Sequence, residues 1–322
     1  MREPSTLGAG LERPGGNRRA TSRIALCALA LAKICCLGEQ GDASSVLFSA
    51  LRGLWRYSLV TDKLSATMQI AKRVYSLAQE QNDSALMIGA YRALGVTSHF
   101  FGDLELGRQY TMRGIQIWRS EGVQSPFEEV TAPAVTCLVH EALFEWFFGE
   151  IACCQATMAE AISLPKDLND MHALAIALLN AGFLGHLERN PTKVERLASD
   201  LIELSTRHQF ASWMAGGEVL RGWAHSVSGD AAEGLSLINR GINDWRASGL
   251  ILLVPYWLAL KAEALYLADR ILEALEAIRE AEEVVERSQK WSKDPKSVGG
   301  VPSCTGCTVF VSRGYWCRRE SN

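Results

Sequence analysis

One segment of this chain occurs twice, and that repetition constrains the fold more than any other feature. Residues 102–122 read GDLELGRQYTMRGIQIWRSEG and residues 229–249 read GDAAEGLSLINRGINDWRASG, at a constant offset of 127 positions without a gap. The identical pairs are Gly102/Gly229, Asp103/Asp230, Gly107/Gly234, Arg113/Arg240, Gly114/Gly241, Ile115/Ile242, Trp118/Trp245, Arg119/Arg246 and Gly122/Gly249. Self-similarity at a fixed offset is typical of stacked supersecondary units that together bury one continuous core. The repeat therefore predicts an architecture, and such arrays bind partners more often than they catalyse reactions.

The apolar pattern predicts that the repeated units are pairs of helices. Apolar residues recur at intervals of three and four, as in Leu64, Met68, Ala71, Val74, Tyr75 and Ala78. Short breaks with Gly, Asn, Asp or Pro separate the helices, and no alternating pattern indicates a sheet. The expected helix pairs are 43–81, 83–121, 131–165, 170–208, 210–247 and 250–289, after a half unit at 22–37. The sequence thus predicts an all-α solenoid of about six and a half repeats.

The breaks also predict local geometry. Gly102-Asp103 and Gly229-Asp230 combine a left-handed glycine at one helix end with an acidic residue at the next helix start. Pro191 suits the first turn of a helix, where its missing donor costs nothing. The longest break lies at 122–132, where we expect an extra loop, and solenoid insertions often gather on the binding face.

Three segments differ in composition. Residues 1–21 are rich in Gly, Pro and Arg and predict a disordered leader, 22–289 form the repeat domain, and 290–322 an irregular tail. The run IALCALALA at 24–32 follows three arginines and superficially resembles a signal peptide. It is too short to span a bilayer, and we interpret it as the helix of the half unit.

The amino-acid composition limits the classes of protein to which this chain can belong. Hydrophobic residues make up 48% and charged residues 21%, which suits a folded chain. The net charge of −3 gives no basic signature for nucleic acid. Nine cysteines are an odd number, and the adjacent pairs Cys35–Cys36 and Cys153–Cys154 are interpreted as small buried apolar residues. We expect a reducing cytoplasm.

Four phrases carry a family resemblance: GLWRY (53–57), YRALGVTSHFFGDLELGRQY (91–110), RGWAHSVSGDAAEGLSLINRGINDWRASG (221–249) and PYWLALKAEAL (255–265). They resemble the C-terminal tetratricopeptide-like region of large bacterial proteins. In those proteins a class III adenylate or guanylate cyclase domain, or a transcriptional-activator module, precedes an AAA-type ATPase domain. The resemblance covers roughly residues 25–289. It implies a tetratricopeptide-like solenoid that serves as a sensing or scaffolding arm for the modules upstream.

The resemblance does not extend to the catalytic activities of the upstream modules. The sequence has no G-x-x-x-x-G-K-[ST] phosphate loop and no stretch that resembles the metal-binding aspartates of a cyclase. We therefore expect no enzyme activity and no cofactor. The tail departs from the family after Trp291, which favours a truncated or frame-altered gene product.

Other candidate chemistry is weak. Cys304 and Cys307, with Cys317 nearby, have the spacing of half a zinc site, but no histidine follows His225, so a fourth ligand is missing. An incidental cysteine-bearing tail is the simpler interpretation, and we expect no metal. The histidines lie on separate predicted helices without a metal-binding spacing: His99, His140, His172, His186, His208 and His225.

The first helix of each pair lines the concave surface in tetratricopeptide-like arrays, so polar residues there are candidate partner contacts. These candidates are Arg56, Arg92, His99, Glu141, Glu145, Asn180, Glu218, Arg221 and Lys261. Trp118 and Trp245 hold equivalent positions and predict packing between units. The first-helix tryptophans Trp55, Trp146, Trp223 and Trp257 could belong to the core or to the groove.

The leading hypothesis is a non-catalytic scaffold that binds a protein segment or an upstream ATPase or cyclase module, with self-association through uncapped solenoid ends possible. One alternative is a sensor domain for a small effector. Others are an enzyme or a truncated functional fragment, assigned to nucleotide cyclisation or ATP hydrolysis through its relatives, and a remnant with no independent role. The sequence does not identify the partner. We expect the chain to bind neither nucleic acid nor a membrane.

Overall fold

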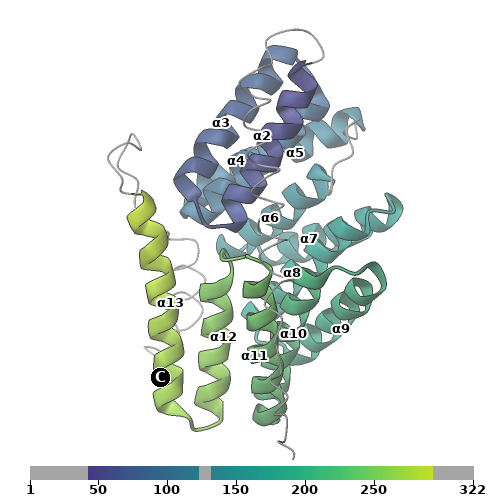
Figure 1. Cartoon of the computed structure of the whole chain (residues 1–322). Coiled ribbons are helices and arrows are strands. Elements are labelled where there is room, and N and C mark those ends of the chain that lie inside the picture. The colour runs from purple at the N-terminus through teal and green to yellow at the C-terminus, as the bar shows by residue number, and fades with distance from the viewer. Residues whose placement is uncertain (1–42, 123–131, 293–322) are drawn as a thin grey trace, which may run out of the picture.

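The structure is a computed structural model that describes residues 43–122 and 132–292. Within these ranges the chain forms helices and no strand (Figure 1). The helices are α2 (Ala43–Val60), α3 (Leu64–Gln81), α4 (Ser84–Phe101), α5 (Leu104–Glu121), α6 (Pro133–Phe147), α7 (Ile151–Asp167), α8 (Met171–Leu187), α9 (Pro191–His208), α10 (Ala211–Val227), α11 (Ala231–Ala247), α12 (Val254–Leu267) and α13 (Ile271–Ser292). They form the six helix pairs that the apolar pattern predicts.

The first helices of successive pairs form the inner layer of the array. Each of α4, α6, α8 and α10 contacts the first helix of the next unit as well as its own partner. These inner helices are buried over most of their surface, whereas α5, α7, α9, α11 and α13 alternate buried and exposed positions. The second helices therefore form the outer layer, and the pairs follow one another around a superhelix (Figure 1).

Turn chemistry sets the helix boundaries as expected. Gly102 and Gly229 end α4 and α10 with φ of 83° and 106°, a left-handed conformation that glycine adopts without strain. The following aspartates cap the next helices. The Asp103 carboxylate accepts a hydrogen bond from the Leu106 amide at 3.2 Å, and the Asp230 carboxylate accepts one from the Glu233 amide at 3.1 Å.

The repeated glycines inside helices permit close packing between the two layers. A Cβ atom on Gly222 of α10 would lie 2.5 Å from the carbonyl oxygen of Gly234 of α11. Gly95 and Gly107 form the equivalent contact between α4 and α5, where the corresponding distance is 3.2 Å. The sequence echo therefore marks positions where two helix backbones approach closely.

The tryptophan side chains that the structure describes are buried in the core or partly buried against it. Trp223 and Trp257 are fully buried and Trp55 is 4% exposed, which favours packing over a groove at these positions. Trp245 is also buried and contacts Trp257 in an edge-to-face arrangement with ring centroids 5.6 Å apart. Its equivalent, Trp118, is partly buried against the same core.

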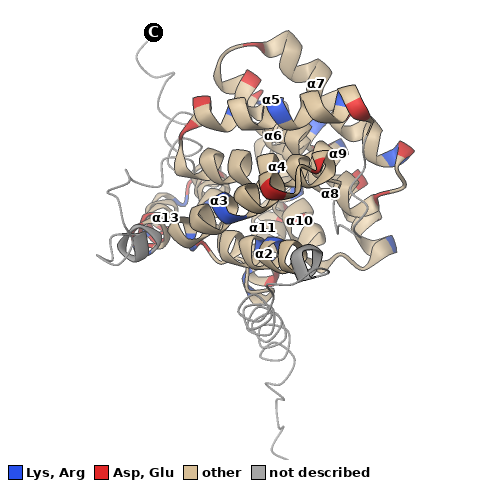
Figure 2. Ribbon diagram, turned by 90° about the horizontal axis from the view of Figure 1, so that it is seen from above, with Lys and Arg blue, Asp and Glu red and all other residues tan. Residues whose placement is uncertain are grey.

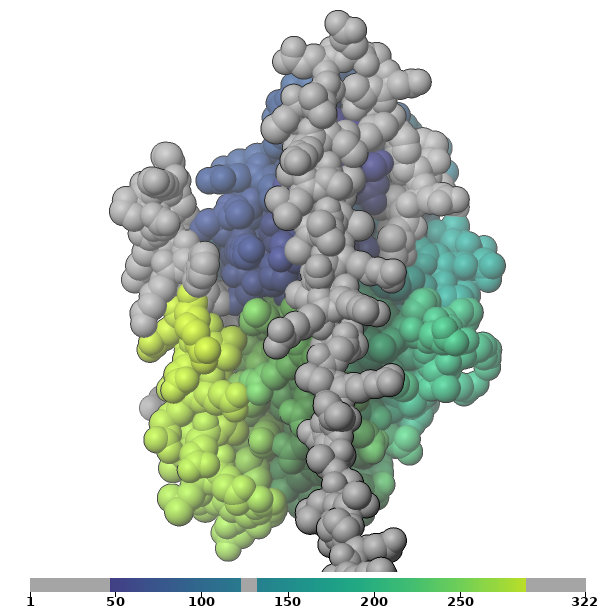
Figure 3. Space-filling view, viewed as in Figure 1, coloured from purple at the N-terminus to yellow at the C-terminus, as the bar shows by residue number. Residues whose placement is uncertain are grey.

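The first and last described units touch each other. The Val60 carbonyl at the end of α2 accepts hydrogen bonds from the amides of Ile251 at 2.9 Å and Leu252 at 3.3 Å. The Leu252 side chain packs into the apolar cluster formed by Trp55 and Leu59. Helix α13 also lies beside α3 (Figure 2). In the space-filling view the purple and blue N-terminal surface meets the green and yellow C-terminal surface (Figure 3).

One interpretation needs correction and several fall outside the described residues. Cys154 is buried as predicted, but Cys153 is exposed, because it lies on the outward face of the first turn of α7. The half unit at 22–37 with Cys35–Cys36, the leader, residues 123–131 of the long break, and Cys304, Cys307 and Cys317 lie outside the described residues. The division into three segments stays a prediction. No helix in the described ranges is both long and apolar enough to cross a membrane.

Candidate functional site

A pocket opens where four inner helices converge. Its space, including the open mouth, is about 360 Å³. It is lined by His99 and Phe100 of α4, His140 and Leu143 of α6, Asn180 and Phe183 of α8, and Leu253 and Tyr256 at the start of α12. Aromatic and apolar groups therefore dominate a wall that carries a few hydrogen-bonding atoms, which is the usual composition of a binding site.

Two stacked histidines form one side of this pocket. The rings of His99 and His140 lie 5.2 Å apart between centroids, with planes only 9° from parallel. Burial lowers the pKa of His99 to about 4. Burial, followed by the neighbouring His99, also lowers the pKa of His140 well below its ordinary value. Both rings are therefore neutral at pH 7, and each can donate one hydrogen bond and accept another.

Tyr256 is held in place by a buried polar network. Its hydroxyl lies 2.8 Å from Nδ1 of His186, and burial raises its pKa well above the ordinary range. His186 Nε2 lies 3.6 Å from the Glu263 carboxylate, which also accepts a hydrogen bond from Trp223 Nε1 at 2.8 Å and pairs with Arg189. These contacts fix the orientation of Tyr256 on the pocket wall.

Of the nine predicted contact residues, the structure brings His99 and Asn180 together in the pocket. The Asn180 side chain is oriented by a 2.8 Å hydrogen bond to the Ile176 carbonyl. Arg56 of α2 faces the start of α8: burial, and after it the charge of Arg56, lowers the pKa of His172 to about 4. Arg92 is buried with its guanidinium 5.3 Å from the Trp55 ring centroid.

The other five predicted residues lie at contacts with outer-layer helices. Glu141 and Glu145 are buried where α6 meets α5 and α7. Glu218 accepts hydrogen bonds from Arg240 of α11, and Arg221 pairs with Glu195 of α9 at 3.0 Å. Lys261 of α12 is close enough to α13 to help lower the pKa of Glu273, behind the larger effect of Arg270. These five side chains are not brought together with the pocket.

Sequence reasoning missed His140, Phe183 and Tyr256. A signal for His140 was present, because His140 and Asn180 each lie nine residues before the left-handed residue that follows their helix, Gly149 and Arg189 respectively. These two residues therefore occupy equivalent positions on successive inner helices, whereas His99 lies three residues before Gly102. Tyr256 carries no such signal, since the chain must curve back on itself to bring α12 to α4.

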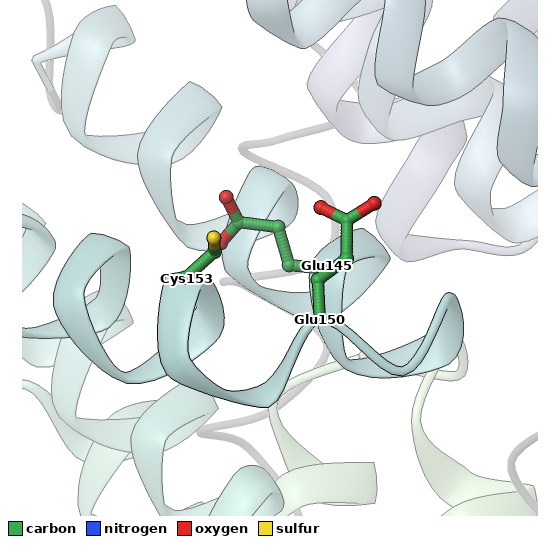
Figure 4. Close-up of side chains that lie close together, drawn as sticks. All are labelled: Glu145, Glu150 and Cys153. Atoms are coloured by element: carbon green, nitrogen blue, oxygen red, sulfur yellow. The ribbon is translucent and has the colours of Figure 1, made fainter.

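Two groups of described side chains have the chemistry of metal ligands. One comprises Glu145, Glu150 and Cys153 at the α6–α7 turn, and the other His225, Asp230 and Glu233 at the α10–α11 turn. Figure 4 shows that the two carboxylates and the thiol of the first group gather on one side of their turn. In the second group both imidazole nitrogens of His225 already lie near carboxylates, Nε2 at 3.3 Å from Glu195 and Nδ1 at 3.5 Å from Glu233.

Comparison with known proteins supports the fold. No protein-family model and no curated protein matches this sequence. The structure is similar to that of NprR in complex with its cognate peptide NprX, with a TM-score of 0.55, 8% identity, and coverage of 85% of this chain and 76% of that chain. For a Rap protein complexed with Competence and Sporulation Factor, the TM-score is 0.47 and the identity 11%, with coverage of 92% of this chain and 97% of that chain. For BtubC from P. vanneervenii, the TM-score is 0.38 and the identity 11%, with coverage of 89% of this chain and 98% of that chain. At such low identity the likeness to NprR concerns the fold alone, and this chain is an all-α, tetratricopeptide-like solenoid.

Proposed function

We propose that this chain is a non-catalytic scaffold that binds a peptide segment of a partner protein in the pocket between α4, α6, α8 and α12. The observation that carries the proposal is the convergence of four units on one aromatic pocket with oriented polar groups at His140, Asn180 and Tyr256. Binding energy in such a site comes from a few buried anchors rather than from the whole surface. The likeness of the fold to peptide-bound NprR supports this reading.

The partner, in this proposal, is an ATPase or cyclase module of a bacterial signalling protein. The support is the resemblance of the repeat phrases to the regulatory arms of such proteins. Partner binding would then alter the curvature of the array and so bias the attached module. The protein would act in the cytoplasm, and the exposed apolar residues Leu272 and Leu275 of the last described unit would permit self-association.

Peptide selection tests the proposal. Peptides are selected on the immobilised protein from a random display library, and their affinities are measured by isothermal titration calorimetry. Asn180→Ala and Tyr256→Phe should weaken binding at least about tenfold, which corresponds to about 1.4 kcal/mol. The matched control is Asn243→Ala, on the exposed face of α11, which should bind as the wild type does. Equal binding by all four proteins would reject the pocket as the site.

The chemistry of the pocket also suits a second candidate, a small effector. Aromatic and apolar side chains with a few polar groups, such as Asn180 and His140, are the usual lining of small-molecule sites. A thermal-shift screen over metabolites distinguishes the two, because a ligand selective for the folded state raises the melting temperature. A hit whose effect disappears in Asn180→Ala, together with failure of the peptide selection, would favour the effector.

A further inference from the structure

The α6–α7 turn brings three potential metal ligands to one place. Glu150 precedes α7, Glu145 lies five residues before it, and Cys153 lies three residues after it. The turn is closed by a 2.8 Å hydrogen bond from the Glu150 amide to the Glu145 carbonyl. As a result, one ligand atom from each of the three side chains lies within 4.8 Å of the other two.

Glu145 is the buried member of this group. The residue is 8% exposed, and its Oε2 atom has no hydrogen-bond partner among the described residues, although the Thr157 side chain hydrogen-bonds to the same carboxylate group. Figure 4 shows its side chain gathered with those of Glu150 and Cys153 above the turn. A buried carboxylate oxygen without a partner is costly, so its orientation toward two further ligands points to a bound cation.

Around the α6–α7 turn there are more carboxylate groups than cationic groups. Glu141, Glu145 and Glu150 lie close enough to one another to affect each other's pKa, and Arg108 is the one cation among the groups that act on Glu145. Arg108 is already engaged: its Nε donates to Glu141 at 3.0 Å, and its terminal nitrogens donate to both oxygens of Glu150. Three carboxylates therefore lie around one guanidinium, and Glu145 is the one of them that Arg108 does not hydrogen-bond.

We propose that Glu145, Glu150 and Cys153 form a binding site for a thiophilic divalent cation of the zinc type. Zinc accepts thiolate and carboxylate ligands, and three protein ligands leave a fourth position for water. Magnesium and calcium prefer oxygen ligands and do not suit the thiol. Each Glu150 oxygen keeps a lone pair beyond the one that Arg108 uses. The thiol of Cys153 loses its proton to solvent as the sulfur–metal bond forms.

Small side-chain movements are enough to reach zinc geometry. Tetrahedral ligands at about 2.0–2.3 Å from zinc lie about 3.5 Å from one another. Glu150 and Cys153 are exposed and can close the remaining distance by changes of rotamer. The group at the α10–α11 turn shares the same sequence spacing, but its histidine already faces carboxylates with both nitrogens, and no member is buried to the same degree.

Cobalt substitution provides the test, because a thiolate–cobalt bond gives a charge-transfer absorption band. Metal-free full-length protein is titrated with Co²⁺ and then with Zn²⁺ in competition. All measurements use a Cys304→Ser, Cys307→Ser background, so that the C-terminal cysteine pair cannot contribute. We expect a band with the intensity of one thiolate per bound cobalt, and its displacement by Zn²⁺.

Two variants and two controls decide the outcome. Cys153→Ser should abolish the band, and Glu145→Gln should weaken binding at least about tenfold. Cys154→Ala and Glu160→Gln, on the same helix, should bind cobalt as the parent does, and circular dichroism checks that every variant is folded. A band that persists in Cys153→Ser, an unchanged affinity in Glu145→Gln, or no band in the parent would overturn the proposal.

Discussion

Single residues decide how closely the two layers of this solenoid approach. Gly222 and Gly234 meet at the α10–α11 contact, where a Cβ on Gly222 would lie 2.5 Å from a backbone oxygen and 3.0 Å from the Ile238 amide nitrogen. Backbone atoms cannot rotate away as a side chain can. The energetic importance of the contact therefore rests on the absence of a side chain.

Gly222→Ala should destabilise the protein by about 1–3 kcal/mol, the usual cost of overpacking a core. Urea denaturation followed by circular dichroism measures the change. Gly149→Asn is the control: Gly149 has φ of 83° with open space around it, and asparagine tolerates that conformation. Equal stability of the two variants would contradict the role assigned to close packing.

Asp62 gives the stability a specific pH dependence. Burial raises the pKa of this carboxyl from its ordinary value of 3.8 to about 7. The folded state therefore binds a proton that the unfolded state releases between these two values. The contribution of Asp62 is fully present below pH 3.8, declines as pH rises through about 7, and is absent above it.

Asp62→Asn should remove this contribution and suits the backbone, because asparagine tolerates the φ of 61° at this position. Free energies of unfolding measured at several pH values from 4 to 8 give the wild-type minus variant difference. The wild-type protein should lose stability relative to the variant as the pH rises from 4 to about 7. The pH effects of His99 and His172 are common to both proteins and cancel in the difference. A constant difference across the range would argue against the raised pKa.

At the scale of helices, the Asp170 side chain accepts hydrogen bonds from backbone amides at the starts of two helices, α6 and α8. One carboxylate oxygen accepts a hydrogen bond from the Ala173 amide at 2.8 Å and so caps α8. The other accepts one from the Ala132 amide at 2.7 Å, directly before α6. Asp103, by contrast, caps α5 through one amide, that of Leu106.

Asp170→Ala should therefore destabilise the protein by about 2–3 kcal/mol, and Asp103→Ala by about 1 kcal/mol. Thermal and urea unfolding compare the two. Hydrogen exchange should show faster exchange at the starts of both α6 and α8 in Asp170→Ala. Faster exchange at the start of α8 alone would mean that the hydrogen bond from the Ala132 amide contributes little to stability.

Helix positions were predictable from sequence because local chemistry determines them. Gly102-Asp103 and Pro191 mark boundaries through backbone conformation and capping, which depend on neighbouring residues alone. The orientation of α6 was not predictable. Residues Pro133–Glu145 are all buried, so no polar stripe distinguishes its groove face from the faces that Glu141 and Glu145 present to α5 and α7.

The pocket was predictable only in part for a related reason. His99 and Asn180 could be identified because they are polar residues on first helices, which the apolar pattern locates, and both line the pocket. Leu253 and Tyr256 reach the same pocket because the superhelix brings its last unit back to its first, which depends on small angles summed over six units. The exposure of Cys153 beside the buried Cys154 likewise depends on which face of α7 packs inward.

At the scale of the whole molecule, the contact between the first and last units should depend on Leu252. Leu252→Asp places a charge in the apolar cluster of Trp55 and Leu59, which should separate the ends and increase the radius of gyration measured by small-angle X-ray scattering. Ile251→Asp is the matched control, because that side chain is 42% exposed. An unchanged scattering curve for Leu252→Asp would show that the backbone hydrogen bonds hold the ends together.

The opposite end of the last unit presents an apolar surface. Leu272 is 77% exposed and Leu275 54%, with Tyr266, Leu267 and Ile271 nearby. If this surface supports self-association, the double variant Leu272→Lys, Leu275→Lys should shift the molar mass toward that of a monomer in light scattering at increasing concentration. A mass that rises equally in both proteins would place the association elsewhere.

The contact between Val60 and the Ile251–Leu252 segment changes how the array comes apart. In an open row of repeats the terminal units have one neighbour each, so fraying begins at the ends and spreads inward. Here the first and last described units also contact each other, so the loss of one unit exposes apolar surface of the other. Unfolding should therefore be shared by all six units in a single cooperative step, as in a compact globular domain rather than a linear chain of repeats.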